Sequence, residues 1–435
     1  MNLEKVRQHF ENAPYPRIPL EASPKNNLDT LYVHNILTPF YLRNQQVLDI
    51  KETVILDAGC GSGYTSLIMA ESNPGAKIVG IDISEQSVKL ARERLQYHGF
   101  ENVEFHAIPI EELPSLGLEF DYINSDEVLY LIPDPLAGLK AMQSVLKPGG
   151  ILRTNLHSSL QRAFYYRAQE VFRMMGLMDG SVEELEVELL REMMRSLDDQ
   201  TYLKVLLWKP VFETDEEAVR ANLLLQGDKG FTVPEMFALL EATNLEFFSM
   251  VQWRQWDLMS LFKNPADLPP FLAMSLPEAT VEDHLHLFEL LQPIHRLLDF
   301  WCGHPNQARS FTPVSEWDEA DWHRARVHLH PQLQAPQVKA DLLECIRTQR
   351  SFDFSRHISA PTTKAIVVES DQAACLLPLW EGVQTVTALA DRWQKLRPVD
   401  CLTLGPVDAR LAFEQVQRLL VRLEVFLYVL LEQPL

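Results

Sequence analysis

Basic residues and cysteine are scarce in this chain, and each shortage excludes a class of protein. Lysine and arginine together number 39 against 60 acidic residues, which gives the 435-residue chain a formal net charge of −21. A surface of that charge repels phosphate backbones, so we expect no nucleic-acid partner. The 5 cysteines include no C-x-x-C pair, which argues against both a disulfide framework and a structural zinc site.

Long apolar runs are also missing from the sequence. The opening stretch "MNLEKVRQHFENA" is charged and lacks the apolar centre of a signal peptide, and the longest late run, "VFLYVLL", is too short to cross a bilayer. These absences predict a cytoplasmic protein with no membrane partner. With 46% hydrophobic residues the chain can still bury a sizeable core, and its length predicts two or three domains.

Short apolar runs that alternate with helical stretches begin at Lys51. The runs are "TVILDAG", "AKIVGID", "VEFHAI", "FDYINS" and "GGILRTNL". Strands that alternate with helices form parallel βαβ units covered on both faces, so residues 51–157 predict an α/β core with a doubly wound, Rossmann-like sheet. Before it, residues 1–50 hold a proline-broken lead and a helix from Asn27 to about Gln46, which together predict an N-terminal lid.

Three further regions follow the predicted core. Residues 158–230 carry helical periodicity and predict a helical insertion that forms a roof over a substrate. In 231–333, a helix capped at Thr232, a strand in "LEFFSMVQW", more helix in "DHLHLFELLQPIHRLLDFWCG" and a last strand in "ARVHLHPQL" would complete the core. Residues 336–435 predict a small α+β domain that resembles a winged helix, with strands in "TKAIVVE" and "FLYVLL".

A glycine turn of the kind that cradles a nucleotide follows the first strand. It reads G-x-G-x-G through Gly59, Gly61 and Gly63, which differs from the G-x-G-x-x-G fingerprint of dinucleotide sites. The carboxylate of Asp57 would repel a pyrophosphate but attracts an ammonium group such as that of methionine. Asp82 comes about 20 residues later, where an acid binds ribose hydroxyls. The turn therefore favours S-adenosylmethionine (SAM).

Four motifs occur in order and at the right separations: "LDAGCGSG", "VGIDIS", "FDYINSDEVLYLIPDP" and "LKPGGIL". Through them the chain resembles the class I SAM-dependent methyltransferases over roughly residues 50–157, and more loosely over 231–333. The resemblance implies a role for each matching position. Asp57, Gly59, Gly61 and Gly63 would form the turn under methionine and ribose, Asp82 and Ile83 would hold the ribose and flank the adenine, and Ser125 would line the cofactor near the methyl donor.

The chain departs from the family after the third strand. Relatives often read Gly-Asp-Ala there, with the aspartate accepting from the adenine amino group, whereas this chain reads "IPIE". Pro109 has neither a polar side chain nor a backbone N–H. Adenine recognition would therefore fall to the backbone of Ile110 or to Glu111.

The methyl acceptor should lie past the ends of the fourth and fifth strands, where Asp126, Glu127, Tyr130, Asn155 and His157 are found. We take His157 and Tyr130 as candidate catalytic residues, because an imidazole titrates near neutral pH and many small-molecule methyltransferases carry a histidine where Tyr130 stands. The alternatives are that His157 caps the strand end and that Tyr130 packs a helix onto the sheet. His328 and His330 lack a third metal ligand, so no metal site is expected.

These observations predict a SAM-dependent methyltransferase that acts on a hydroxyl or amine of a small metabolite. One alternative is a protein lysine methyltransferase that uses the C-terminal domain to dock its acceptor. Another is a SAM-binding regulator without turnover. In each case we expect the C-terminal domain to serve dimerisation or docking of a peptide, because the chain is too acidic to favour DNA.

Overall fold

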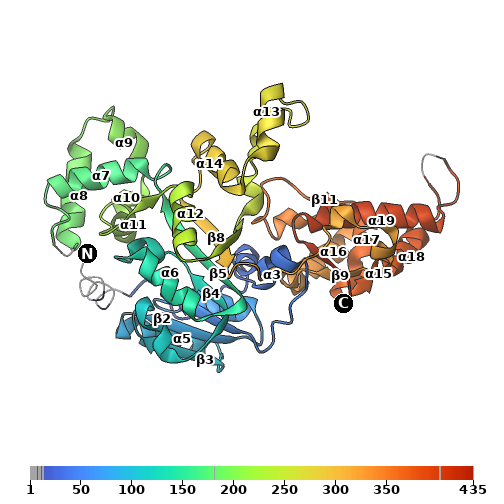
Figure 1. The fold of residues 1–435 in the computed structure, drawn as a ribbon, viewed down its shortest axis with the longest axis horizontal. Coiled ribbons are helices and arrows are strands. Elements are labelled where there is room, and N and C mark those ends of the chain that lie inside the picture. The colour runs from blue at the N-terminus through green and yellow to red at the C-terminus, as the bar shows by residue number, and fades with distance from the viewer. Residues whose placement is uncertain (1–6, 8–10, 12–13, 181, 401–402, 435) are drawn as a thin grey trace.

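The computed structural model describes residues 7, 11, 14–180, 182–400 and 403–434. Of the predicted N-terminal lid, residues 1–6, 8–10 and 12–13 lie outside the described residues. Figure 1 shows a central sheet with a helical lobe at one side and a long C-terminal unit at the other. Among the described residues, no helix combines the length and the apolar character that crossing a membrane requires.

The central sheet has the strand order β3-β2-β1-β4-β5-β8-β7, and a short β6 also pairs with β5. Five parallel strands form its first part: β1 Val54–Ala58, β2 Lys77–Asp82, β3 Val103–Ala107, β4 Phe120–Ser125 and β5 Leu146–Ser158. Ile55 and Leu56 are adjacent and both fully buried, in apolar clusters on opposite faces of the sheet. Burial of both faces explains why these strands read as continuous apolar runs. The predicted α/β class is confirmed.

Helices connect the strands and cover both faces of the sheet. Thr232 caps α12 through a capping box with Glu235, as predicted. The connecting helices are α4 Tyr64–Ser72, α5 Glu85–Tyr97, η1 Ile110–Leu116, α6 Pro135–Ser144 and α12 Val233–Ala242. β6 Gly230–Phe231 lies just before α12.

One predicted helix is partly wrong. In "DHLHLFELLQPIHRLLDFWCG" the helix α14 covers only Val281–Leu291, and Leu297–Gly303 form β8. This strand is inserted antiparallel between β5 and β7 Glu246–Met250. Because β8 is buried on both faces, its residues are apolar or small apart from Asp299, and periodicity alone does not distinguish such a strand from a buried helix.

The expectation that "ARVHLHPQL" adds a last strand to the core is also wrong. β9 Arg326–Leu329 pairs with β12 Gln384–Thr385 and β13 Val429–Glu432 in a separate three-stranded sheet. Val327 and Leu329 point into the apolar core of the C-terminal unit. Burial there, and not closeness in sequence to the core strands, decides where this strand pairs.

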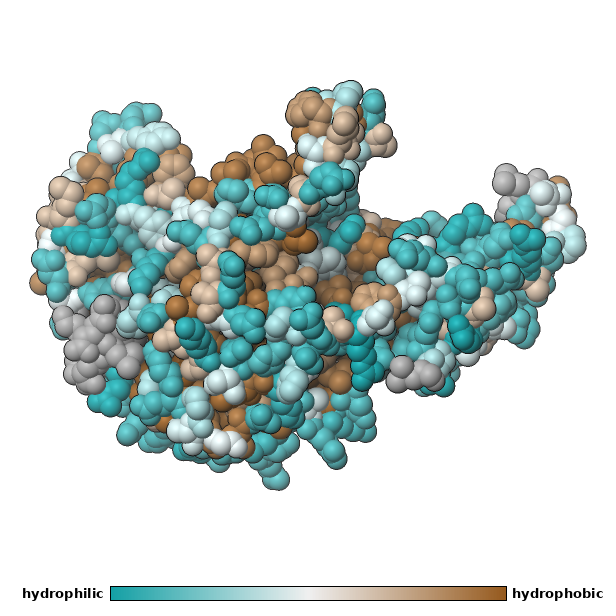
Figure 2. Space-filling model, viewed as in Figure 1, coloured by the Kyte–Doolittle hydropathy of each residue, from teal (hydrophilic) through white to brown (hydrophobic). Residues whose placement is uncertain are grey.

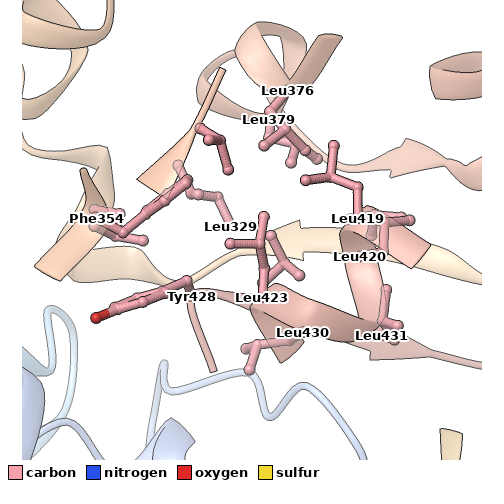
Figure 3. Close-up of a cluster of buried hydrophobic side chains, with 14 of the residues drawn as sticks. Leu329, Phe354, Leu376, Leu379, Leu419, Leu420, Leu423, Tyr428, Leu430 and Leu431 are labelled. Carbon is pink, nitrogen blue, oxygen red and sulfur yellow. The ribbon is translucent and has the colours of Figure 1, made fainter. Parts of the chain in front are cut away.

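The C-terminal unit packs four longer helices on the small sheet. Figure 3 shows how Leu329 of β9 meets Leu419, Leu420 and Leu423 of the last helix, next to Tyr428. The helices are α16 Pro336–Arg347, α17 Ser370–Leu376, α18 Val386–Leu396 and α19 Ala409–Glu424, with α15 Glu319–Arg324 before them and a two-residue pair of strands, β10 Phe352–Asp353 and β11 Val367–Val368. The winged-helix assignment stays a prediction.

Two N-terminal helices join this unit to the core. The predicted single helix is divided into α2 Leu28–Val33 and α3 Leu37–Asn44, because the side-chain oxygen of Asn35 accepts from the backbone N–H of Leu37 and Asn73 accepts from Ile36. The Tyr32 hydroxyl of α2 donates to the backbone oxygen of Phe426 at 2.9 Å. Tyr41 of α3 donates to Leu431 in the same way.

The helical lobe and a second projection stand above the sheet. The lobe encloses its own apolar core, in which Phe172 and Val187 are fully buried. Figure 2 shows apolar side chains gathered on α14 and on the projecting α13 Pro270–Ser275. The lobe helices are α7 Ala163–Met174, α8 Glu184–Ser196, α9 Tyr202–Leu207, α10 Val211–Thr214 and α11 Glu216–Asn222.

Candidate active site

The glycine turn between β1 and α4 has a backbone that only glycine adopts without strain. Gly59, Gly61 and Gly63 have φ angles of +92°, +51° and +81°. Space is also short, because a Cβ atom on Gly59 would lie 2.4 Å from Val128 and one on Gly63 would lie 2.5 Å from the backbone of Ala91. Gly63 is the N-cap of α4. The turn therefore ends at a helix N-terminus, past the carboxyl end of β1.

Asp57 is the buried acid of this turn. Its Oδ2 accepts from the Ser66 hydroxyl at 2.6 Å and its Oδ1 accepts from the Asn124 side chain at 3.2 Å. Burial raises the pKa of Asp57 to about 6, although both hydrogen bonds act to lower it. A carboxylate that is this costly to ionise gains from a cation beside it. Asp57 therefore fits the ammonium group of methionine.

Asp82 stands at the end of β2 and is fixed by the turn itself. Its Oδ2 accepts from the backbone N–H of Gly61 at 3.0 Å, and its Oδ1 accepts from that of Ser84 at 2.9 Å. Burial raises the pKa of Asp82, and these two bonds oppose that effect. The contact with Gly61 brings together two of the predicted cofactor residues. Ile83 follows directly and is half-buried.

Ser125, the last residue of β4, is fully buried, and its hydroxyl has no hydrogen-bond partner among the described residues. A buried hydroxyl without a partner is uncommon and fits a missing ligand. Together with the glycine turn and the two acids, it makes the carboxyl edge of β1, β2 and β4 suitable for SAM. The side chain of Ile110 is buried in the apolar core, and Glu111 is exposed on η1.

Residues 14–20, from the predicted lid, cross the glycine turn. The backbone N–H of Ser62 donates to the backbone oxygen of Tyr15 at 2.8 Å, and the Ser62 hydroxyl donates to the backbone oxygen of Pro16 at 2.7 Å. Arg94 of α5 donates to the carbonyls of Ile18 and Pro19, both at 2.7 Å, and to that of Ser62 at 3.0 Å. We call residues 14–20 the strap. One arginine therefore holds both the strap and the turn.

The strap also brings Tyr15 toward the predicted acceptor residues. Burial raises the pKa of Tyr15, and the neighbouring carboxylates of Glu127 and Glu217 add to the increase. Glu127 follows β4, whereas Glu217 lies in the helical lobe on α11. The phenol of Tyr15 is therefore within electrostatic reach of both the sheet edge and the lobe.

Glu127 is held by groups from three elements. Its backbone has a φ of +57°, which is uncommon for a residue with a side chain and often marks a functional position. Its N–H donates to Asn155 at 2.8 Å, and its carboxylate accepts from the Tyr130 hydroxyl at 3.1 Å. Arg296 donates to both oxygens of the same carboxylate, at 3.0 Å to Oε2.

His157 is buried between an acid and an arginine. Its Nδ1 lies 2.6 Å from Asp228 Oδ1, its Nε2 lies 3.1 Å from Arg296 Nη1, and its ring stacks on Tyr130 with centroids 3.7 Å apart. Because arginine only donates, Nε2 must accept, so the proton of the neutral ring sits on Nδ1 and is donated to Asp228. Burial lowers the pKa of His157, while the hydrogen bond to Asp228 opposes that effect.

Asp228 anchors this arrangement from the loop before β6. It accepts from Arg162 at 2.8 Å and from Gln169 at 3.0 Å, and its side chain is fully buried. Burial alone would raise the pKa of Asp228, but the hydrogen bond from His157 and the charge of Arg162 bring it to about 2. Sequence reasoning missed Asp228, Arg162 and Arg296, because none stands in a recognisable motif and Arg296 lay in a stretch interpreted as helix.

A second polar cluster links the end of β4 to α2. Arg153 of β5 donates to Asp299 at 2.8 and 3.1 Å and contacts Nε2 of His34, the C-cap of α2, at 3.0 Å. Asp126 accepts from Asn155 at 2.5 Å and lies 3.8 Å from both Arg153 and His34. Burial would raise the pKa of Asp126, but Arg153 and His34 hold it well below its usual range.

Comparisons with known proteins identify the kind of domain that carries this site. Residues 49–207 match a family model described as a methyltransferase domain. Over 100 residues the chain is 40% identical to the ubiquinone biosynthesis O-methyltransferase of Bordetella avium, which covers 22% of this chain and 39% of that protein. An uncharacterized Synechococcus protein is 28% identical over 61% of this chain and 63% of its own length. The chain thus matches less than two thirds of the length of these curated relatives.

A solved structure resembles nearly the whole chain. PKMT2 from Rickettsia typhi aligns with a TM-score of 0.59 and 16% identity, covering 92% of this chain and 75% of that one. Its complex with AdoHcy aligns over 96% and 77%, with 17% identity and the same TM-score. At this identity the likeness shows the fold, C-terminal unit included.

The fold and the glycine turn define an α/β protein with a nucleotide site past the carboxyl ends of its parallel strands. Its residues 49–207 match a methyltransferase domain, and this stretch has the fold and glycine turn of a class I SAM-dependent methyltransferase domain, with SAM as the cofactor. Contact with SAM stays a prediction for each of the residues assigned to the cofactor from sequence, which are Asp57, Gly59, Gly61, Gly63, Asp82, Ile83, Ile110, Glu111 and Ser125. The catalytic assignment of Tyr130 and His157 also stays a prediction.

Proposed function

We propose that this protein transfers a methyl group from SAM to a hydroxyl or amine of a small metabolite. The observation that carries the proposal is the set of polar side chains just past β4 and β5, centred on Glu127, beside the predicted methyl-donor position at Ser125. The similarity to an O-methyltransferase over 100 residues supports a small acceptor. The proposal covers the whole chain, whereas that similarity covers about a fifth of it.

SAM supplies a methyl group on a sulfonium, which is already a good leaving group. The chain must therefore align the acceptor, exclude water and receive a hydrogen bond from a protonated nucleophile. Glu127 suits the last task, because Arg296 and Tyr130 only donate to it and leave further lone pairs on its carboxylate. The strap supports water exclusion, because it covers the glycine turn.

His157 has a positioning role in this proposal. Its Nε2 already accepts from Arg296, so it holds the arginine that orients Glu127. The ring itself is fixed by Asp228 and by stacking on Tyr130. The sequence analysis took His157 as a candidate base, whereas here we propose that His157 positions Arg296. Its role as the base stays a prediction.

The experiment is methyl transfer from isotopically labelled SAM. The purified protein is incubated with extract of the source organism, which is then separated by size. Label in the small-molecule fraction supports the proposal, and label confined to protein would replace it with a protein acceptor. Absence of label in both, with AdoHcy binding intact, would favour a regulator without turnover. Asp49→Asn, a substitution of an aspartate that precedes the core, serves as a matched control for Asp57→Asn and Asp82→Asn.

A further inference from the structure

Asn124 of β4 joins the acid of the glycine turn to the polar cluster around Arg153. Its side chain is fully buried, and β4 pairs with β1 on one side and with β5 on the other. In this register Asn124 lies beside Asp57 of β1 and beside Arg153 of β5. The three side chains therefore form a row across one face of the sheet, near its carboxyl edge.

The orientation of the Asn124 amide follows from the chemistry of its two neighbours. Its Nδ2 donates to Asp57 Oδ1 at 3.2 Å, and its Oδ1 accepts from Arg153 Nη1 at 3.3 Å. Because a guanidinium carries only donors, the amide oxygen has to face Arg153, and the NH₂ group has to face Asp57. Arg153 therefore sets which end of the amide Asp57 meets.

The guanidinium of Arg153 is itself held by other groups. Its Nε and Nη2 donate to the two carboxylate oxygens of Asp299, at 3.1 and 2.8 Å. Its Nη1 lies 3.0 Å from Nε2 of His34, whose Nδ1 lies 2.9 Å from the backbone oxygen of Thr30. Because arginine only donates, Nε2 of His34 accepts, and Nδ1 donates to the carbonyl. The planar fork is thus fixed where it reaches Asn124.

Both carboxylate oxygens of Asp57 meet a donor as a result. Ser66 donates to Oδ2 at 2.6 Å, and Asn124 donates to Oδ1. A hydroxyl can rotate and accept, whereas an amide NH₂ group cannot, so Asn124 favours the ionised form of Asp57. Each carboxylate oxygen keeps a second lone pair for a further donor. Asp57 is thus held in the form that an ammonium group needs.

The charge balance around this row favours a further cation. Within the described residues, the side-chain hydrogen bonds to Asp57 come from neutral groups, while Arg153 is paired with Asp299 and lies 3.8 Å from Asp126. Burial raises the pKa of Asp57, with Asp126 adding to the increase. A positive charge beside Asp57 would offset this cost of ionisation, and the ammonium group of SAM is such a charge.

We propose that Asn124 and Arg153 are positioning residues for the ammonium group of SAM. Arg153 orients the Asn124 amide, and Asn124 orients Asp57, which receives the ammonium. The inference goes beyond the proposed function, because it concerns the cofactor whichever acceptor is used, and it rests on the predicted contact between Asp57 and the ammonium. It also gives α2 a part in cofactor binding, since His34 contacts Arg153 from the C-cap of that helix.

Two ligands separate this role from a general effect on the fold. AdoHcy carries the ammonium group, whereas methylthioadenosine has the same adenine, ribose and thioether but no amino-acid end. Calorimetry measures the affinity of both ligands for the wild type, Asn124→Leu and Arg153→Lys. Leucine is close to asparagine in size but has no polar side-chain atoms, and lysine keeps the charge beside Asp299 without the planar fork. Thr154→Val is the matched control, because Thr154 is the next residue of β5, on its opposite face, and its hydroxyl has no partner among the described residues.

We expect Asn124→Leu to weaken AdoHcy binding roughly tenfold, the effect of one lost hydrogen bond to a charged group, and to change methylthioadenosine binding by less than about twofold. Arg153→Lys should cause a smaller loss with the same dependence on the ligand, and Thr154→Val should bind both ligands like the wild type. Equal weakening of both ligands by Asn124→Leu would overturn the positioning role, because it would show general damage to the glycine turn. Unchanged AdoHcy affinity in Asn124→Leu would overturn it as well.

A double-variant cycle tests whether Asn124 acts through Asp57. Asp57→Asn should also weaken AdoHcy more than methylthioadenosine, and adding Asn124→Leu should then cause little further loss. A full additional loss of AdoHcy affinity would overturn the route through Asp57. Equal weakening of both ligands by Asp57→Asn would overturn the ammonium contact and this inference with it, whereas the proposed methyl transfer to a small molecule fails only if the labelling experiment fails.

Discussion

Arg296 Nη1 donates to His157 Nε2 across 3.1 Å, although the two residues are 139 positions apart in the chain. The contact joins the start of β8 to the end of β5. Its chemical consequence is that the histidine nitrogen suited to act as a base is already in use. His157 therefore supports Arg296, and Arg296 in turn orients Glu127.

Glu127→Gln should lower methyl transfer by about 100-fold, within the range typical of a lost acid–base group. Glutamine keeps the size of the side chain but accepts hydrogen bonds through one oxygen and carries no charge. AdoHcy affinity should change little. The control Glu119→Gln, at an exposed acid just before β4, should retain wild-type transfer. Equal rates for wild type and Glu127→Gln would remove Glu127 from the mechanism.

Asp228→Asn should destabilise the fold by about 3 kcal/mol, because it leaves the buried Arg162 without its carboxylate. Chemical denaturation measures this free energy of unfolding. The control Glu170→Gln removes an exposed ion pair with Arg173 and should cost less than about 1 kcal/mol. If Asp228→Asn is as stable as the control, the buried cluster does not support the site as described.

Stability of the cofactor-free protein should fall as pH rises from about 4 to about 6, through the Asp57 contribution. The folded-state pKa of Asp57 is raised to about 6 from 3.8, so the folded protein holds this proton more tightly than the unfolded chain does, and loses that advantage as the pH increases. Asp57→Asn should remove the contribution and raise stability at pH 7 by about 1–3 kcal/mol.

The same substitution should weaken AdoHcy binding, because the amide no longer attracts the ligand's ammonium group. Melting temperatures with and without AdoHcy between pH 4.5 and 7.5 measure both effects together. An Asp57→Asn variant that melts lower than the wild type at pH 7 would contradict the assignment of a strained buried carboxylate. Unchanged AdoHcy affinity would contradict its role in the cofactor site.

Arg94→Met should speed AdoHcy dissociation roughly tenfold, because it removes the two hydrogen bonds from Arg94 to the strap and the one from Arg94 to the glycine turn, each worth about 1 kcal/mol or less in net terms. Stopped-flow displacement measures the rate. Arg92→Ala provides the control on the same helix, since Arg92 donates to Phe105 and not to the strap. Equal dissociation rates for the two variants would show that the strap does not retain the cofactor.

The sequence predicted the cofactor side of the molecule better than the acceptor side. Asp57, the glycines and Asp82 lie within 26 residues, at or directly after the ends of β1 and β2, so local spacing was enough to bring them together. Arg296 and Asp228 reach His157 from distant segments, and only the pairing of β8 with β5 places Arg296 there. β8 itself was missed because a strand buried on both faces has no polar alternation.

The boundary of the C-terminal unit was also harder to predict from the sequence, because it depends on contacts between distant segments. β9 was assigned to the core from its position in the chain, but Val327 and Leu329 find their apolar neighbours in the C-terminal unit. The joint made by Tyr32 and Tyr41 depends on single hydroxyls that reach backbone oxygens almost 400 residues away. No local pattern encodes such contacts.

The most direct test of the account is methyl transfer from labelled SAM to the small-molecule fraction of source-cell extract, with wild type and Glu127→Gln side by side. We predict labelled small molecules with the wild type, and about a hundredfold less with the variant at equal AdoHcy occupancy. Label that enters only protein, or small-molecule labelling that is the same in both, would contradict the account.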